Sequence, residues 1–109
     1  MIHIEYLGYN MYVGNTSSEN NYLINNSKPD DYWIHINNYS SAHGIIINPS
    51  LERIPIKIIK YLCCYIKKKS NKCNSIKNLM FDVTKIKYLQ LTNVPGQVII
   101  KHNLKQITI

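Results

Sequence analysis

Residues 32–47 of the chain read YWIHINNYSSAHGIII, and this stretch decides the fold class. Its first five residues, Tyr32 to Ile36, are mostly aromatic or β-branched, which is the composition of a β-strand. Asn37 to Ser41 then reads as a turn, and the apolar run Gly44 to Ile47 reads as a second strand. We therefore predict two buried strands that lie next to each other.

Further strands are predicted on both sides of this pair. We expect them over residues 1–6, 9–13, 79–83, 86–91, 97–100 and 106–109, with a turn at Val94-Pro95-Gly96. A short helix is predicted over residues 18–26, with Ser18 as its N-cap and Pro29 just beyond its end. Because strands outnumber helices, we expect an α+β fold with a small mixed or antiparallel sheet.

The main helix is predicted over residues 55–69, where Pro55 suits a first helical turn. At 100° per residue, one stripe is apolar: Ile58, Ile59, Leu62, Cys63 and Ile66. The opposite side carries Lys57, Lys60, Tyr61, Cys64 and Lys68. We therefore expect an amphipathic helix with a basic outer face.

The length of 109 residues and the 45% hydrophobic content predict one folded domain over residues 1–109. No apolar run is long enough to span a membrane, and the first residues lack the pattern of a secretion signal. Cys63, Cys64 and Cys73 are odd in number, so we expect reduced thiols. These features predict a cytoplasmic protein with no membrane partner.

Charge is distributed very unevenly along the chain. Residues 1–53 carry a net charge of −3, and residues 54–109, with eleven lysines against Asp82, carry +10. A basic half of this kind favours a polyanionic partner, because lysines near phosphates release condensed counterions. A solvated lysine-rich surface without a partner is the alternative interpretation.

Two motifs resemble signatures of a known family. Asp30-Asp31-Tyr32-Trp33-Ile34-His35 and Ser40-Ser41-Ala42-His43 resemble the D-x-W-x-H and G/S-S-x-H signatures of the NFACT-R domain, the RNA-binding domain of ribosome-associated quality-control proteins. Further similar segments are Tyr12-Val13-Gly14, Asn21 to Leu23, Lys85, Lys87 and Pro95-Gly96-Gln97-Val98. The resemblance covers nearly the whole chain and implies RNA binding without catalysis.

The sequence is most similar to the family's short members, typified by coiled-coil domain-containing protein 25, which also read S-S-A-H. Two features depart from the family pattern. Asn15 replaces a basic residue that many members carry after the glycine, and no charged helical tail follows Ile109. We therefore expect a minimal, free-standing version of the domain.

The candidate nucleotide site consists of Asp31, Trp33, His35, Ser41 and His43. Strand alternation predicts that Asp31, Trp33 and His35 share one side of their strand. Trp33 would stack on a base, and the two histidines would donate to phosphate or sugar, with Asp31 orienting His35 or accepting from a base edge. The alternative is structural: Trp33 lies in the core, Asp31 ties the loop after Pro29, and both histidines are satisfied internally.

Six further residues are candidate contacts to the nucleic-acid backbone: Lys57, Lys60, Tyr61 and Lys68 on the helix, and Lys85 and Lys87 from the strands. Such lysines position RNA without reading its sequence. We expect them beside the strand of Trp33 and His35. The predicted partner is transfer or ribosomal RNA, although the residues do not separate RNA from DNA or fix the oligomeric state.

Two other function classes remain open. Exposed strand edges favour a module that binds a ribosome-associated protein. A nuclease, with or without metal, would use His35 and His43 as acid and base and Asp31 to hold one imidazole. No phosphate loop, nucleophile motif or metal-ligand spacing supports that enzyme, so we expect no catalytic residue, metal or cofactor.

Overall fold

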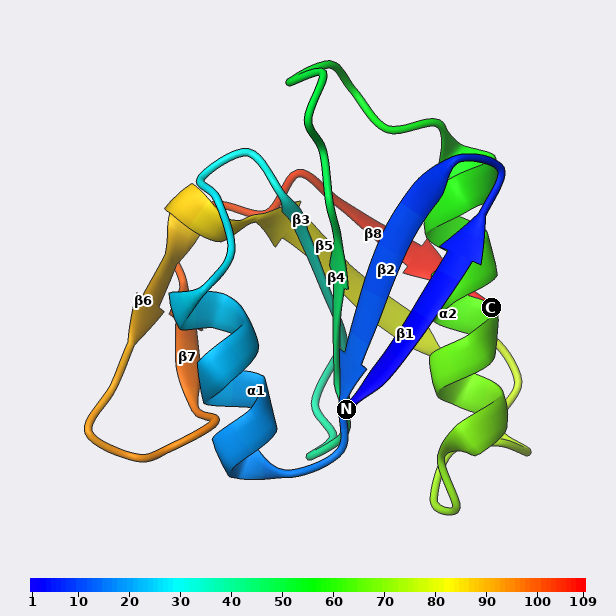
Figure 1. Ribbon diagram of the computed structural model, residues 1–109. Coiled ribbons are helices and arrows are strands. Elements are labelled where there is room, and N and C mark those ends of the chain that lie inside the picture. The colour runs from blue at the N-terminus through cyan, green and yellow to red at the C-terminus, as the bar shows by residue number, and fades with distance from the viewer.

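A six-stranded antiparallel sheet forms the centre of the computed structural model, which describes all 109 residues (Figure 1). In spatial order its strands are β1 (Ile2–Tyr6), β2 (Tyr9–Gly14), β4 (His43–Ile46), β3 (Tyr32–Ile36), β5 (Met80–Lys85) and β8 (Lys105–Thr108). The predicted neighbours β3 and β4 pair with each other, with Trp33 opposite Ile45. The α+β prediction is confirmed, and the main sheet is antiparallel throughout.

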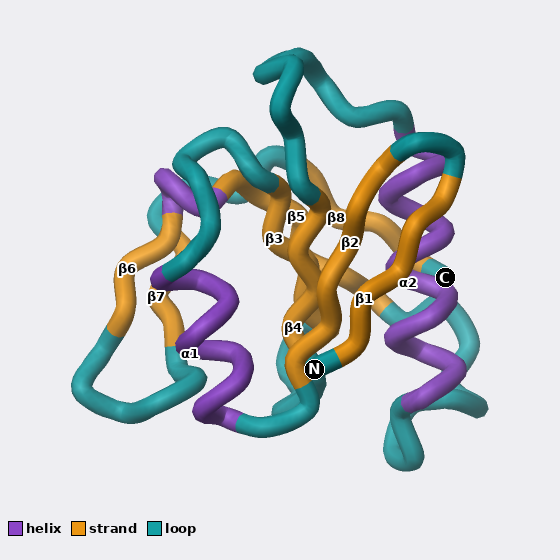
Figure 2. The backbone as a smooth tube through the Cα atoms, in the orientation of Figure 1, coloured by secondary structure: helices purple, strands orange, loops and turns teal.

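Different elements cover the two faces of this sheet. Helix α2 (Ile56–Lys69) packs on one face, and helix α1 (Ser17–Asn25) covers the other together with a two-stranded sheet of β6 (Leu89–Leu91) and β7 (Val98–Ile100) (Figure 2). Side chains alternate between the two faces along β3, so this strand contributes to the hydrophobic core on each face. Tyr32 and Ile34 belong to the core under α2, and Trp33 belongs to the core under α1.

Helix α2 packs as its apolar periodicity predicts. All five residues of the predicted stripe are buried: Ile58, Ile59, Leu62, Cys63 and Ile66. Each isoleucine or leucine contributes about 2 kcal/mol through the hydrophobic effect. The helix lies against Gly44 of β4, where an added Cβ would sit 2.8 Å from Leu62 Cδ2 and 2.9 Å from Ile66 Cδ1. No helix in the structure is long and apolar enough to cross a membrane.

The short helix begins one residue earlier than predicted, and its N-cap is Thr16 rather than Ser18. Thr16 Oγ1 accepts the backbone N–H of Glu19 at 3.1 Å, and the Glu19 carboxylate accepts the N–H of Asn15 at 2.9 Å. This reciprocal pair satisfies two amides at the helix N-terminus. It therefore fixes the point at which the chain leaves β2 and enters α1.

The prediction of one strand over residues 86–91 is wrong. Residues Ile86–Tyr88 form a 3-10 turn, and only Leu89–Leu91 continue as β6. The backbone amides of Ile86 and Lys87 donate to the carbonyls of Asp31 and Pro29, each at 3.0 Å. These bonds lead the chain away from the main sheet and place β6 and β7 over its α1 face. The strand predicted over Tyr32–Ile36 has the same bounds in the structure, and the other predicted strand bounds differ by at most two residues.

Candidate functional site

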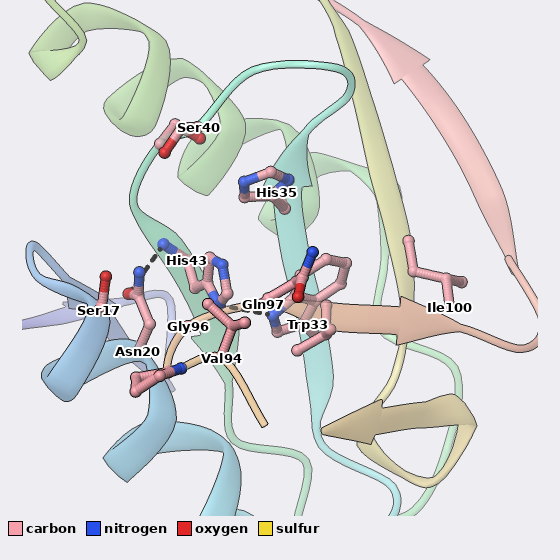
Figure 3. Close-up of a pocket in the computed structure, with 13 residues that line it drawn as sticks. Ser17, Asn20, Trp33, His35, Ser40, His43, Val94, Gly96, Gln97 and Ile100 are labelled. Atoms are coloured by element: carbon pink, nitrogen blue, oxygen red, sulfur yellow. Dashed lines mark hydrogen bonds between the residues drawn. The ribbon is translucent and has the colours of Figure 1, made fainter. Parts of the chain in front are cut away.

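A pocket of about 490 Å³ opens on the α1 face of the sheet (Figure 3). Strands β3 and β4 form its floor, and the first turn of α1 and the segment 94–98 form its walls. Its polar lining residues are Ser17, Asn20, His35, Ser40, Ser41, His43 and Gln97. No lysine, arginine or carboxylate lines the pocket.

Trp33 fixes the tautomer of His43 inside this pocket. Trp33 Nε1 lies 3.3 Å from His43 Nδ1, and an indole N–H only donates hydrogen bonds. His43 Nδ1 must therefore accept, which places the proton of the neutral ring on Nε2. Burial lowers the pKa of His43 to about 3, and the charge of a protonated His35 adds to this effect. His43 is thus uncharged at neutral pH.

His35 lies against both of these rings. It stacks on Trp33, with ring centroids 5.5 Å apart, and meets His43 edge to face at 4.9 Å. Burial lowers the pKa of His35, while the Asp82 carboxylate, opposite His35 on β5, raises it in part. The net shift is downward, so both imidazoles are neutral near pH 7.

Asn20 of α1 connects this helix to the floor of the pocket. Its Oδ1 accepts the backbone N–H of His43 at 3.2 Å, as the dashed line in Figure 3 marks. The Asn20 side chain has room because residue 14 is glycine: a Cβ there would lie 2.3 Å from Asn20 Oδ1. Gly14 therefore allows the contact that holds α1 against β4.

The segment 94–98 is held against the same helix. The Gly96 N–H donates to Asn21 Oδ1 at 3.2 Å, and Gly96 adopts φ +80°, which favours glycine. A Cβ at Gly96 would also lie 3.1 Å from the backbone of Ser17. This close approach positions Gln97 over the pocket.

The predicted basic face lies on the other side of the sheet from the pocket. Lys57, Lys60, Tyr61 and Lys68 are all exposed on the outer face of α2. The expectation that these lysines lie beside Trp33 and His35 is wrong, because α2 packs against the opposite core. We call these four residues the α2 basic face.

The α2 basic face lies in an acid-free part of the chain. Eight basic and no acidic residues occur between Glu52 and Asp82. The Tyr61 ring stacks on Tyr6 of β1 with centroids 3.8 Å apart, which fixes an aromatic surface among the lysines. The positive potential of this side therefore has no nearby carboxylate within its own segment to balance it.

Lys85 and Lys87 belong to neither surface. Both Nζ atoms lie 3.1 Å from Asp30 Oδ1, near the end of β5. Hydrogen bonds from Lys87 and Lys85 lower the pKa of Asp30, and the same contact raises the pKa of Lys87. Asp30 thus balances part of the positive charge of this pair.

The sequence matches the family model of the NFACT protein RNA binding domain over residues 2–102. The chain belongs to this family. Seven solved chains match the fold of this NFACT domain, among them the C-terminal part of the fibronectin/fibrinogen-binding protein from Streptococcus suis. That likeness has a TM-score of 0.80 at 17% identity, and it covers 93% of this chain and 41% of the other. No curated protein matches the sequence.

The NFACT fold brings together four of the residues predicted from its motifs: Trp33, His35, Ser41 and His43. Trp33 is 1% exposed, so neither ring face is open for the predicted base stacking, and the ring instead supports the two histidines. Asn20 and Gln97 were missed as site residues, although both lie in or beside segments that carry the family resemblance.

Asp31 lies outside the pocket of the NFACT domain. It is 2% exposed, and its Oδ1 accepts the N–H of Asn48 while its Oδ2 accepts the N–H of Lys28, both at 2.9 Å. These bonds match the structural alternative, in which Asp31 ties the loop around Pro29. Asp31 does not orient His35.

Proposed function

We propose that this domain binds folded RNA of the translation machinery, transfer or ribosomal RNA, in the cytoplasm, and that it contributes to ribosome-associated quality control. Membership of a family of RNA-binding domains supports a binding role rather than catalysis. The observation that carries the proposal is the α2 basic face, which offers exposed lysines without intervening carboxylates.

Binding at this face is electrostatic. Lysine is a compact point charge that contacts phosphates without reading bases, so the α2 basic face sets position and affinity rather than sequence preference. If about four phosphates are contacted, the slope of log affinity against log salt is near −3. Tyr61, held against Tyr6, adds a fixed hydrogen-bonding group between the lysines.

The double variant K60Q/K68Q is expected to bind transfer RNA about tenfold more weakly at physiological salt, with a salt slope reduced by about 1.5. The cause is the loss of two phosphate contacts on the α2 basic face. A titration of labelled transfer RNA at several salt concentrations measures both quantities. The control K28Q/K105Q removes the same charge from outside α2 and is expected to retain most of the affinity.

Equal weakening by the two double variants would assign the effect to net charge and exclude the α2 basic face. Affinity that does not respond to salt would reject RNA docking by lysines and favour a ribosome-associated protein as the partner. A parallel titration with duplex DNA of the same length compares the two nucleic acids. Equal affinity for both would contradict the proposed preference for RNA.

A further inference from the structure

We infer that the pocket formed by Trp33, His35, His43, Asn20 and Gln97 receives one unpaired nucleobase of the bound RNA through the base's uncharged edge. This inference rests on the proposed function, because it assigns a subsite on the same RNA. The inference concerns a different surface, because the pocket and the α2 basic face lie on opposite faces of the sheet.

The charge of the pocket favours a neutral occupant over a phosphate. No ionised side chain lines it, and both histidines are neutral at pH 7. A phosphate would lose hydration there without meeting a cationic side chain, and the Glu19 carboxylate in the first turn of α1 offsets the positive end of that helix. A nucleobase presents neutral donors and acceptors, so its transfer into the pocket carries no such cost.

His43 supplies a neutral donor for a base edge. Its Nδ1 is occupied by Trp33, and its Nε2–H has no partner in the protein. Every fully buried side-chain nitrogen and oxygen in the structure has a hydrogen-bond partner, so the unpaired Nε2 keeps some accessible surface although His43 as a whole is 3% exposed, and His43 lines the pocket. Trp33 is therefore a positioning residue, because it fixes which nitrogen of His43 donates.

Gln97 supplies a second group, from the wall formed by segment 94–98. Its Oε1 accepts from Thr92 Oγ1 at 3.0 Å, which leaves the amide N–H groups available to a ligand. Gln97, Trp33 and His43 all line the pocket, and Figure 3 draws the Gln97 side chain in front of Trp33 in this view. Ring nitrogens and carbonyl oxygens of bases accept such bonds, so the two donors suit a base edge.

The shape of the pocket suits one planar ring rather than a helix. Its volume of about 490 Å³ falls within the range of sites for single small ligands. Val94, Pro95 and Val98 form an apolar wall on the side of segment 94–98. A base that is paired and stacked within a duplex cannot enter such a site, so the occupant must be unpaired.

The test compares two RNA hairpins that differ only at one bulged position, which carries either adenosine or an abasic ribose. Wild-type protein is expected to bind the adenosine hairpin about tenfold more tightly, because the base adds two hydrogen bonds that the abasic ribose lacks. Trp33 is the only tryptophan, so its fluorescence should change with the adenosine hairpin and much less with the abasic one. A uridine bulge repeats the comparison with a smaller base.

His43→Phe removes the donor while keeping a ring, and the adenosine-to-abasic ratio is expected to fall toward one without loss of affinity for the abasic hairpin. Gln97→Ala, on the exposed segment, gives a second variant that does not disturb the core, and its ratio should also fall. K60Q/K68Q is expected to weaken both hairpins equally and to leave the ratio unchanged.

The possible failures are distinguishable. Equal affinity of wild type for the two hairpins, or an unchanged ratio in both His43→Phe and Gln97→Ala, overturns the nucleobase site and leaves salt-dependent docking intact. Absence of salt-dependent binding to either hairpin overturns the proposed function itself.

Discussion

Asp31→Ala is expected to lower the free energy of unfolding by about 3 kcal/mol, because it leaves two backbone N–H groups without an acceptor. The Asp31 carboxylate accepts from Asn48 and Lys28, and the Asn48 side chain donates to the carbonyls of Asp30 and Glu52. Loss of the carboxylate therefore loosens the two loops that precede β3 and follow β4. Urea unfolding at neutral pH measures the change.

Two control variants separate this role from RNA contact. Asp31→Asn keeps one acceptor oxygen and is expected to lose about half as much stability. Asp30→Asn removes the neighbouring carboxyl, which makes only partly exposed ion pairs with Lys85 and Lys87, and should change stability little. Folded Asp31→Asn protein should bind RNA as wild type does. An Asp31→Ala protein that stays as stable as wild type but binds RNA more weakly would show that Asp31 contacts RNA.

Acidification from about pH 7 to about pH 5 is expected to lower the free energy of unfolding by about 2 kcal/mol through His43 alone. Its pKa is about 3 in the folded state, held down by burial and by His35, and near 6.5 when unfolded. In this window the unfolded chain takes up a proton that the folded chain does not. The stabilisation is thus complete above pH 6.5 and is lost as pH falls toward 3.

The pKa of His35 is also lowered, so His35 further reduces the free energy of unfolding as the pH falls. The carboxyls of Glu19 and Asp30, whose pKa values are lowered by hydrogen bonds, act in the same direction but contribute little here, because carboxyls of the unfolded chain are still mostly ionised at about pH 5. Urea unfolding at the two pH values measures the effect. His43→Gln, which cannot be protonated, should show a much smaller dependence. If the free energy of unfolding depended equally on pH in wild type and His43→Gln, a group other than His43 would be responsible.

Local patterns predicted the elements of the fold that depend on local sequence. The apolar stripe of α2 follows from the spacing of Ile58, Leu62 and Ile66, and the adjacency of β3 and β4 follows from two apolar runs joined by a short turn. The break after Lys85 was not predictable in this way. It depends on hydrogen bonds to the carbonyls of Pro29 and Asp31, which are more than fifty residues away in the sequence.

The candidate site was predictable only in part for the same reason. Alternation correctly placed Trp33 and His35 on one side of β3, but Asp31 precedes the strand, so the period of two does not extend to it. No periodicity indicates which face of a sheet a helix will cover. The helix lysines were therefore assigned to the face of Trp33, although α2 packs on the other one.

The separation of the two surfaces by the sheet constrains the geometry of any RNA that uses both. The α2 basic face and the pocket lie on opposite faces of the sheet, in a domain that measures 35 × 33 × 25 Å along its principal axes, so a straight duplex that lies on α2 does not enter the pocket at the same time. Only an RNA that bends around the edge of the domain, or that offers two arms at a corner, can touch both faces at once. If the proposed function is correct, an RNA that contacts both surfaces is therefore recognised by its bent or branched shape as well as by the base in the pocket.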